Sequence, residues 1–523
     1  MKSQPWRAFA LVASACFAGC GGDEEGPAPE IPTENAFTLM PAVPRATVAQ
    51  VPTLASQPGI RAFPGADGFG ARATGGRGGR VIYVTSLARE GPGTLSEALA
   101  AEGPRYVLFK VSGLIDATPY IAKGNVTIAG QTSPGGIIVR GIHTDEANFC
   151  DSTCGAGVRG VDNIILRHIR TRPGEPGANA LIDGDGLRIR HSRDVVIDHV
   201  SIGNAVDESI EISYSNHVTV QDSVLAETIG GHAVRGGILV NYSNPAAGYE
   251  LDALTIVRTA WVRILGRYPE LSRESDAAAG STLRVELSNN LLWDQRYYID
   301  TGHSAGTPAR RVGDAFYQMN WVGNLGVVRP TFAYGMLFFP NPTGRSTVFF
   351  DDDRLTSRPD RTNWELVYCC DDFLDAPTQP RPMWAAAMRH DFPAMNYLPS
   401  ADVRRYLLAH AGAFPRDAMD RRLMGYVADG VSPAGFPNVN LGNDAYTLAW
   451  ASPSAAPAAP LDTDNDGMPD AWERAHNLDP AVDDHNGLTV GAAMGGVLDG
   501  YPNLEVYLAE LAEQRLAEGP WGR

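Results

Sequence analysis

Three short segments carry acidic residues whose types and spacing suit a cation site. Residues 183–189 read Asp-Gly-Asp-Gly-Leu-Arg-Ile, residues 198–199 read Asp-His, and residues 207–211 read Asp-Glu-Ser-Ile-Glu. Carboxylate oxygens are the ligands that Ca²⁺ prefers, and acids one structural repeat apart can converge on one ion if successive repeats stack. The alternative is that these are solvated acids of turns. Asp198 and His199 are interpreted as a structural pair beside the site.

A second candidate cation site lies near the C-terminus, in residues 462–473. This segment reads Asp-Thr-Asp-Asn-Asp-Gly-Met-Pro-Asp-Ala-Trp-Glu, which has the ligand spacing of an EF-hand loop with glycine at its sixth position. The predicted ligands are Asp462, Asp464, Asp466, Met468 through its backbone carbonyl, Asp470 and Glu473. The module resembles dockerin-like or thrombospondin-type calcium repeats, which implies a structural role.

A paired second loop is expected at residues 495–505. Asn503 and Glu505 fit its end, but Gly495 and Val497 stand where its early acids should be. This second loop is therefore predicted to be weak or empty.

The elements that must position the first site are short strands. Between residues 125 and 329, β-branched runs alternate with turns of Gly, Asn, Asp or Ser, and successive runs start 23 to 38 residues apart. The runs start at Asn125, Asn163, Asp194, His217, Leu254 and Leu283. No helical stripe of similar strength interrupts them, which excludes a βαβ fold. Each coil buries its inward residues only by stacking on the next coil, so the pattern predicts an all-β parallel β-helix and not a sandwich.

Shifts in composition divide the chain into segments. We predict a lipoprotein-type signal peptide over 1–19, a flexible tether over 20–59, the β-helix over 60–340, loops and helices packed on it over 341–430, a linker over 431–460 and the calcium module over 461–515. Helices are expected within residues 400–429, where Val403, Tyr406 and Leu407 share one face. The end of the linker is rich in Ala and Pro, as spacers are.

The first twenty residues indicate export. Lys2 and Arg7 precede an apolar run over 8–18 that is too short to span a membrane permanently. Residues 17–20, Phe-Ala-Gly-Cys, resemble the lipobox of bacterial lipoproteins, in which Cys20 would carry the lipid. An ordinary signal peptide cut near this point is the alternative. We expect a secreted or cell-surface protein, anchored to the outer membrane through its lipid.

Besides Cys20, four cysteines follow the leader, namely Cys150, Cys154, Cys369 and Cys370. Export favours structural disulfides, and three pairings are open. A cysteine metal site is the alternative, but no pair of histidines and no second Cys-x-x-Cys lies nearby.

Composition limits the possible partners. The 523 residues are 44% hydrophobic and 20% charged, which is enough apolar material for a large core. The net charge of −17 argues against a nucleic-acid partner. It also disfavours steering of an acidic polymer, so a bound metal or a cluster of Arg and Lys must mediate any such contact. A monomer is expected.

Several phrases, in order, resemble polysaccharide lyase family 1, which contains the pectate lyases. These phrases are residues 62–70, 75–79, 81–85, 91–95, 111–115, 128–132 and the Val-Ile-Asp-His of 196–199. The resemblance spans residues 60–430 and implies a right-handed parallel β-helix. It also implies Ca²⁺ as cofactor and β-elimination of polygalacturonate, the acidic plant cell-wall polysaccharide called pectate.

The resemblance assigns roles to individual residues. Asp185, Asp207 and Glu211 match the family's calcium-binding carboxylates, and Asp183 matches an extra acid of some members. Arg267, in the phrase Arg-Tyr-Pro-Glu, matches the arginine that removes the proton beside the uronate carboxylate. Arginine keeps its proton near neutral pH, so this role predicts an alkaline optimum. The alternative is an Arg267 that pairs with an acid such as Glu208 or Glu270.

Two positions depart from the family pattern. Glu270 stands where the family has a second arginine, and Arg273 could compensate as a substrate-binding residue. Arg235, after His232, stands where relatives usually carry lysine, and a guanidinium can bind a carboxylate through two hydrogen bonds. The leading hypothesis is therefore a pectate lyase-type enzyme. The alternatives are a non-catalytic surface protein that binds polysaccharide, a lyase for another uronate polymer, and a hydrolase on the same fold.

Overall fold

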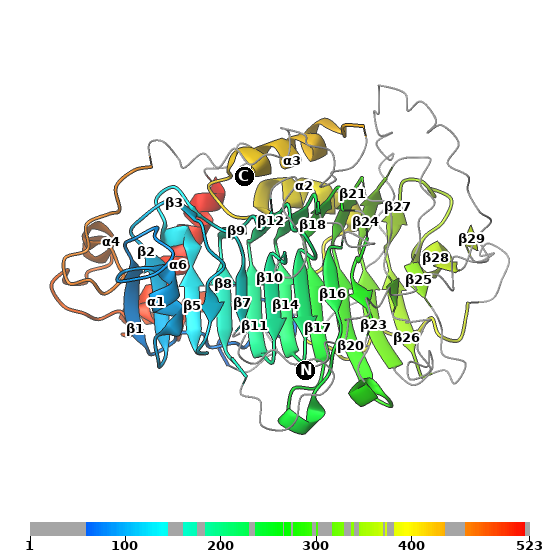
Figure 1. The fold of residues 1–523 in the computed structure, drawn as a ribbon, viewed down its shortest axis with the longest axis horizontal. Coiled ribbons are helices and arrows are strands. Elements are labelled where there is room, and N and C mark those ends of the chain that lie inside the picture. Colours follow the sequence, from blue (N-terminus) through cyan, green and yellow to red (C-terminus); the bar gives the residue numbers. More distant parts are fainter. Residues whose placement is uncertain are drawn as a thin grey trace, which may run out of the picture.

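Three parallel sheets lie along the long axis of the molecule and form a right-handed parallel β-helix (Figure 1). The computed structural model describes residues 59–144, 160–174, 184–229, 236–264, 266–272, 276–294, 300–301, 316–328, 336–338, 345–369, 372–373, 381–434 and 456–517. Strands of the three sheets follow one another in rotation, so each full coil gives one strand to each sheet. The predicted fold class is confirmed.

The sheets are called A, B and C here. Sheet A contains β1 (Arg80–Val84), β2 (Arg105–Phe109), β5 (Val126–Ala129), β8 (Ile164–Arg167), β11 (Arg193–Asp198), β14 (Asn216–Gln221), β17 (Asp252–Val257), β20 (Thr282–Ser288), β23 (Phe316–Val322) and β26 (Thr347–Asp351). Sheet B contains β3 (Gly113–Ile115), β6 (Ile137–Val139), β9 (Ile169–Thr171), β12 (Ser201–Gly203), β15 (Val224–Ala226), β18 (Ala260–Val262), β21 (Leu291–Trp293), β24 (Leu325–Val327) and β27 (Arg354–Leu355). Sheet C contains β4 (Tyr120–Ile121), β7 (Ile142–Thr144), β10 (Leu187–Arg190), β13 (Ile210–Ser213), β16 (Ile238–Val240), β19 (Glu270–Leu271), β22 (Asp300–Thr301), β25 (Met336–Phe338), β28 (Val367–Cys369) and the antiparallel β29 (Asp372–Phe373).

The helices lie at the ends and on the outside of the β-helix. They are α1 (Leu95–Ala100), α2 (Ser400–His410), α3 (Ala418–Asp429), α4 (Asp470–Ala475), α5 (Thr489–Met494) and α6 (Asn503–Ala517). Helix α1 closes the first coil, because its buried Leu95, Ala98 and Leu99 join the interior cluster. In the described part of the chain, no helix combines the length and the apolar character that crossing a membrane requires.

The interior consists of stacked apolar columns. Along sheet A, the register places side by side Ile128, Leu166, Ile197, Val220, Ile256, Leu287, Trp321 and Phe350. All of these side chains are buried in one cluster. Burial stabilises each by about 1.5–3 kcal/mol relative to exposure, so the columns hold successive coils in register.

The turn from sheet A to sheet B explains the recurring polar residues of the sequence. One residue per coil takes the left-handed conformation there, namely His168, His199, Asp222, Arg258, Asn289 and Asp352, with φ between 47° and 55°. Asn and Asp tolerate this conformation better than most residues. The following residues form a side-chain ladder, in which the amide of Asn290 donates to Asn324 (3.1 Å) and that of Asn324 to Asp353 (3.0 Å).

Helices α2 and α3 cover the outer face of sheet B, as Figure 1 shows. Their apolar residues, including Val403, Leu407, Leu423 and Val427, pack on β15, β18, β21 and β24. Buried ion pairs fasten α3 to the end of the sheet, because Arg422 of α3 reaches Glu227 (2.7 Å). These helices lie in the stretch where the sequence predicts helices.

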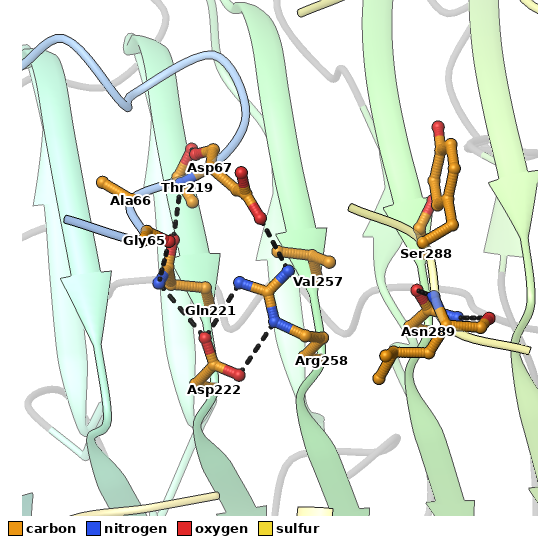
Figure 2. Close-up of polar contacts among 12 residues, drawn as sticks. Gly65, Ala66, Asp67, Thr219, Gln221, Asp222, Val257, Arg258, Ser288 and Asn289 are labelled. Atoms are coloured by element: carbon orange, nitrogen blue, oxygen red, sulfur yellow. Dashed lines mark hydrogen bonds and ion pairs between the residues drawn. The ribbon is translucent and has the colours of Figure 1, made fainter. Parts of the chain in front are cut away.

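Segments from outside the β-helix cover the outer face of sheet A. The N-terminal segment over 62–76 crosses several strands, and Figure 2 shows Arg258 between Asp67 of this segment and Asp222. The distances are 2.7 Å and 2.9 Å. A second segment crosses β20 and β23, where the buried Glu286 accepts from Arg389 (3.0 Å). Phe69 and Phe392 join the two segments, with ring centroids 5.1 Å apart.

The C-terminal module packs on the first strands of sheet A. Met468, Leu504 and Leu508 of the module form one buried cluster with Tyr106 and Leu108 of β2. The sequence predicts a separate module, but this buried contact makes it part of the β-helix surface. Contacts between residues about 400 positions apart leave no local pattern in a sequence.

The parallel sheets extend beyond residue 340, where the sequence predicts their end. Strands β26, β27 and β28 continue sheets A, B and C in place of the expected long loops. The predicted residues Cys20, Cys150, Cys154, Asp183, Arg235, Arg273 and Cys370 lie outside the described residues, as do the predicted leader and most of the tether and linker.

Candidate functional site

The outer face of sheet C carries a row of charged side chains. Parallel pairing places side by side His143, Arg188, Glu211, Leu239 and Glu270, on β7, β10, β13, β16 and β19. Side chains alternate between the two faces of a strand, and Leu187, Ile189, Ile210 and Ile212 fill the interior. The residues of this row therefore point outward.

A cluster of three carboxylates lies just before strands β10 and β13. Asp185, Asp207 and Glu208 each offer an oxygen, and these oxygens lie within 4.8 Å of one another. Asp185 and Glu208 are 1% and 2% exposed, and the backbone N–H of Glu208 donates to Asp185 Oδ1 (3.0 Å). Burial, with the charges of Glu211 and Asp207, raises the pKa of Asp185 to about 8. The cluster thus concentrates negative charge that a cation would stabilise.

Glu211, the third predicted ligand, is close to this cluster but faces two arginines. Arg190 lies 2.6 Å from Glu211 Oε2, and Arg188 bridges Asp185 (2.8 Å) and Glu211 (3.5 Å). Burial alone would raise the pKa of Glu211, but Arg190, the hydroxyl of Ser213 and Arg188 together outweigh burial and lower it. Glu208 is the third member of the carboxylate cluster, and Glu211 stays a predicted ligand beside it.

Arg267, the predicted catalytic residue, reaches the same cluster from the following coils. One terminal nitrogen, Nη1, forms an ion pair with Glu208, and Nε lies 2.7 Å from Glu270 Oε2. Glu270 is held in turn by the hydroxyl of Ser272, which donates to Oε1 (2.5 Å). The structure therefore brings Arg267 together with both acids of the alternative interpretation.

Gly236 makes the contact between Arg267 and Glu208 possible. It lies between them in the stack, with Ser209 N donating to Gly236 O (3.2 Å) and Gly236 bridged to Gly266. A Cβ atom at Gly236 would lie 2.2 Å from Arg267 Cδ. The missing side chain leaves the space through which Arg267 extends.

The side chains in and around the carboxylate cluster include more acids than arginines. Five carboxylates, those of Asp185, Asp207, Glu208, Glu211 and Glu270, face the guanidinium groups of Arg188, Arg190 and Arg267. Among the described residues, the acids of this site therefore outnumber its guanidinium groups, which favours a bound cation. The donor set consists of carboxylate oxygens only, which suits Ca²⁺ better than a transition metal.

The predicted EF-hand loop adopts a folded turn at the start of α4. Asp462, Asp464 and Asp466 offer oxygens within 4.8 Å of one another, and Gly467 has a φ of +104° that side chains disfavour. Glu473 is 0% exposed, and in the part of the chain that the structure describes neither of its carboxylate oxygens has a hydrogen-bond partner. Burial and the neighbouring aspartates raise the pKa of Glu473 to about 8. A buried carboxylate without partners, facing other acids, fits a cation ligand.

The remaining predicted ligands of this loop have other contacts. Asp470 accepts hydrogen bonds from Thr463 Oγ1 (2.9 Å) and Arg474 (3.0 Å). The side chain of Met468 is buried against sheet A, which leaves its backbone carbonyl as the predicted ligand. In the expected second loop, Glu505 is paired with Arg77 (2.7 Å) and Tyr106 (2.9 Å), so its side chain is engaged by the β-helix.

Asp198 and His199 lie at the turn from sheet A to sheet B, away from the row on sheet C. Asp198 accepts from Arg167 (2.7 Å) and Gln221 (2.8 Å), and the ring of His199 stacks on that of His168 with 4.8 Å between centroids. Burial holds the pKa of His168 well below its usual range. These contacts are those of a buried structural cluster.

Sequence reasoning named Glu208 as a possible partner of Arg267 but not as a member of the carboxylate cluster, and it missed Gly236, Arg188 and Arg190 as parts of the site. Glu208 follows Asp185 by 23 residues, which is also the spacing between the strand starts Asp194 and His217. This spacing could have predicted that Glu208 stacks on Asp185. Gly236 lies in a stretch with no recognisable motif, and its role depends on the side chain of a residue in the next coil.

Comparisons with known proteins point to one group of relatives. No protein-family model matches the chain. The chain is 27% identical over 484 residues to the probable pectate lyase C of Emericella nidulans, which covers 90% of this chain and 97% of the relative. It is 28% identical over 458 residues to the probable pectate lyase C of Aspergillus fumigatus, with coverage of 86% and 93%.

Solved structures with a similar fold include jun a 1, the major allergen from cedar pollen. It covers 66% of this chain and 92% of its own, with 16% identity and a TM-score of 0.42. Pectate lyase II from Xanthomonas campestris covers 66% of this chain and 97% of its own, with 12% identity and a TM-score of 0.35. Along most of its length, the chain is similar to proteins named probable pectate lyase.

Proposed function

We propose that the chain is a calcium-dependent pectate lyase that cleaves polygalacturonate by β-elimination. The observation that carries the proposal is the arrangement on sheet C, where a buried carboxylate cluster and Arg267 meet on one outer face. The similarity to proteins named probable pectate lyase supports it, because that similarity extends over most of both chains. An acidic chain needs a bound cation to receive an acidic polymer.

Each step of β-elimination can be given to a residue of this chain. Asp185, Asp207 and Glu208, with Glu211 beside them, would hold Ca²⁺, which supplies positive charge against the uronate carboxylate and the enolate that forms from it. Arg267 would take the proton beside that carboxylate, as the family resemblance implies. Arg267 accepts this proton in its uncharged form. The electron pair of the broken C–H bond then forms the double bond, and the glycosidic oxygen leaves with the pair of the broken C–O bond and takes a proton from water.

The remaining predicted site residues complete this proposal. Asp183 would add a carboxylate to the cation site, and Arg235 and Arg273 would bind uronate carboxylates of the polymer. Arg188 and Arg190 line the same face and could contact the chain of sugars once the cation occupies the acids. We also propose that the protein is exported as a monomer, with a lipid on Cys20 as its anchor in the outer membrane.

The C-terminal loop would hold a second Ca²⁺ with a structural role. The ligands would be Asp462, Asp464, Asp466, the carbonyl of Met468, Asp470 and Glu473. Glu473 is buried and has no hydrogen-bond partner among the described residues, which supports this assignment. The position of the loop against β2 supports a structural role.

A non-catalytic polysaccharide-binding protein is the second candidate, and Glu270 favours it. Its carboxylate holds the guanidinium of Arg267 where the family carries a second positive charge. Incubation with polygalacturonate, with and without a chelator, separates the candidates. Calcium-dependent ultraviolet absorbance from unsaturated sugar ends supports the lyase. New reducing ends without that absorbance support a hydrolase, and binding without cleavage supports the second candidate.

A further inference from the structure

Glu208 is shared between the carboxylate cluster and Arg267. We propose that Arg267 competes for Glu208 with a cation bound by the carboxylate cluster. Binding of the cation then releases the Nη1 end of Arg267 toward the substrate. This inference deepens the proposed function and rests on it only in that the cluster of Asp185, Asp207 and Glu208 binds a cation.

Glu208 is a buried acid. This side chain is 2% exposed, so its charge has little access to water and requires a positive partner. Within the described residues, Glu208 forms its ion pair with Arg267. A cation among Asp185, Asp207 and Glu208 would take over the neutralisation of the same carboxylate.

Arg267 can change partners at Nη1 while Glu270 holds its Nε. Its Nε is held by Glu270 at 2.7 Å, and Glu270 is fixed by Ser272. Arginine has five N–H donors on a planar group, so loss of the contact at Nη1 leaves the pair at Nε intact. Glu270 therefore acts as a positioning residue. It keeps Arg267 beside the carboxylate cluster after Arg267 loses its contact with Glu208.

Gly236 leaves room for the side chain of Arg267 to reach Glu208. Arg267 Cδ and Cγ lie 2.2 Å and 2.9 Å from the position of a Cβ atom at this residue. Any larger residue would block the extended side chain from reaching Glu208. The glycine thus permits the resting contact that the cation must break.

The calcium affinity of the carboxylate cluster tests this inference. Calorimetric titration of the full-length protein measures it. All variants carry Glu473→Gln, which removes calcium binding by the C-terminal loop. The titration then measures the carboxylate cluster alone. Gly236→Ala changes no charge but displaces Arg267, and Arg267→Lys keeps the charge but cannot span Glu208 and Glu270. We expect each to tighten calcium binding at least about fivefold, as loss of a direct competitor requires.

A double-mutant cycle separates competition from general charge effects. In a Glu208→Gln background, Gly236→Ala and Arg267→Lys should no longer change calcium affinity, because the shared acid is gone. Arg284→Lys is the matched control, since Arg284 pairs with Asp252 on sheet A (2.9 Å) and should leave affinity unchanged. Melting curves without calcium check that each variant is folded.

Three outcomes are decisive. Tighter binding in both variants that vanishes in Glu208→Gln supports the competition. Unchanged affinity in Gly236→Ala and Arg267→Lys overturns it, even if the wild type cleaves polygalacturonate. If the wild type gives no calcium-dependent ultraviolet product but the affinities change as expected, the proposed lyase activity fails while the competition stands.

Discussion

The hydroxyl of Tyr83 in β1 donates a hydrogen bond to Asp462, the first residue of the C-terminal calcium loop. The last module of the chain is thereby fastened to the first strand of the β-helix. Lys110 adds a contact to Asn465 in the same loop (2.8 Å), and Met468 is buried against Tyr106. An ion that orders this loop should therefore stabilise the N-terminal end of the β-helix.

Chelation should lower the melting temperature through this loop. A ligand at 100 times its dissociation constant stabilises the folded state by about 2.7 kcal/mol, and chelation removes that contribution. Glu473→Gln should abolish the part of the calcium response that comes from the loop. Glu513→Gln, on the exposed face of α6, is the matched control. Scanning calorimetry with calcium and with chelator measures both, and an unchanged response in Glu473→Gln would count against the loop as a calcium site.

Loss of Glu227 should strongly destabilise the contact between α3 and sheet B. Glu227 is 0% exposed and pairs with Arg263 (3.1 Å) and Arg422 (2.7 Å). Glu227→Ala removes the acid that Arg263 and Arg422 share and leaves Asp294 as the acid that pairs with Arg263. Loss of one partner of a buried ion pair typically costs about 3–5 kcal/mol. Urea unfolding measures the loss. Asp402→Ala, which breaks an exposed pair with Arg405 in α2, should cost less than about 1 kcal/mol.

Acid should destabilise the fold through buried neutral histidines. Burial, with the nearby charge of Arg190, lowers the pKa of His191 to about 4, below the value of about 6.5 in an unfolded chain. Between these values the unfolded chain binds a proton that the folded chain does not, so stability falls as pH falls from 6.5 to 4. The slope from one such group reaches about 1.4 kcal/mol per pH unit.

Substitution of His191 checks this assignment. His191 has a φ of 49°, which asparagine tolerates, so His191→Asn should flatten the pH dependence of the free energy of unfolding. His217→Asn is the control, because His217 has a φ of 53° but an exposed side chain. Equal slopes in the wild type and in His191→Asn would show that His191 is not responsible.

Replacement of Arg267 should affect turnover more than substrate affinity. Proton transfer by a positioned group typically contributes about 100-fold or more to the rate, so Arg267→Lys should lower kcat by about that factor. Arg284→Lys, on sheet A, should leave kcat unchanged. Initial rates over a range of polygalacturonate concentrations separate kcat from KM, and a raised KM with normal kcat would assign Arg267 to binding alone.

The repeat of the β-helix could be predicted from its sequence, and parts of the site could not. Stacked columns such as Ile197, Val220 and Ile256 belong to β-branched or aliphatic runs, whose spacing reports the coil length. The strands after residue 340 were missed because β27 and β28 are short and lie between irregular segments.

The details of the cation site depend on three-dimensional stacking. Asp207, Glu208 and Glu211 are all acidic, and the family pattern favoured the first and the last. The coil length of 23 residues places Glu208 level with Asp185, whereas Glu211 lies three residues further, level with Arg188, and meets Arg190. The docking of the C-terminal module, with Glu505 on Arg77, joins residues 428 positions apart and leaves no local signal.

The calcium dependence of β-elimination in two variants tests the central claim most directly. The initial rate of ultraviolet absorbance from polygalacturonate should fall about 100-fold or more in Asp185→Asn, because the groove loses a cation ligand. In Glu473→Gln, assayed below its melting temperature, the rate should stay near that of the wild type. A normal rate in Asp185→Asn, or product that forms equally well in excess chelator, would contradict the account.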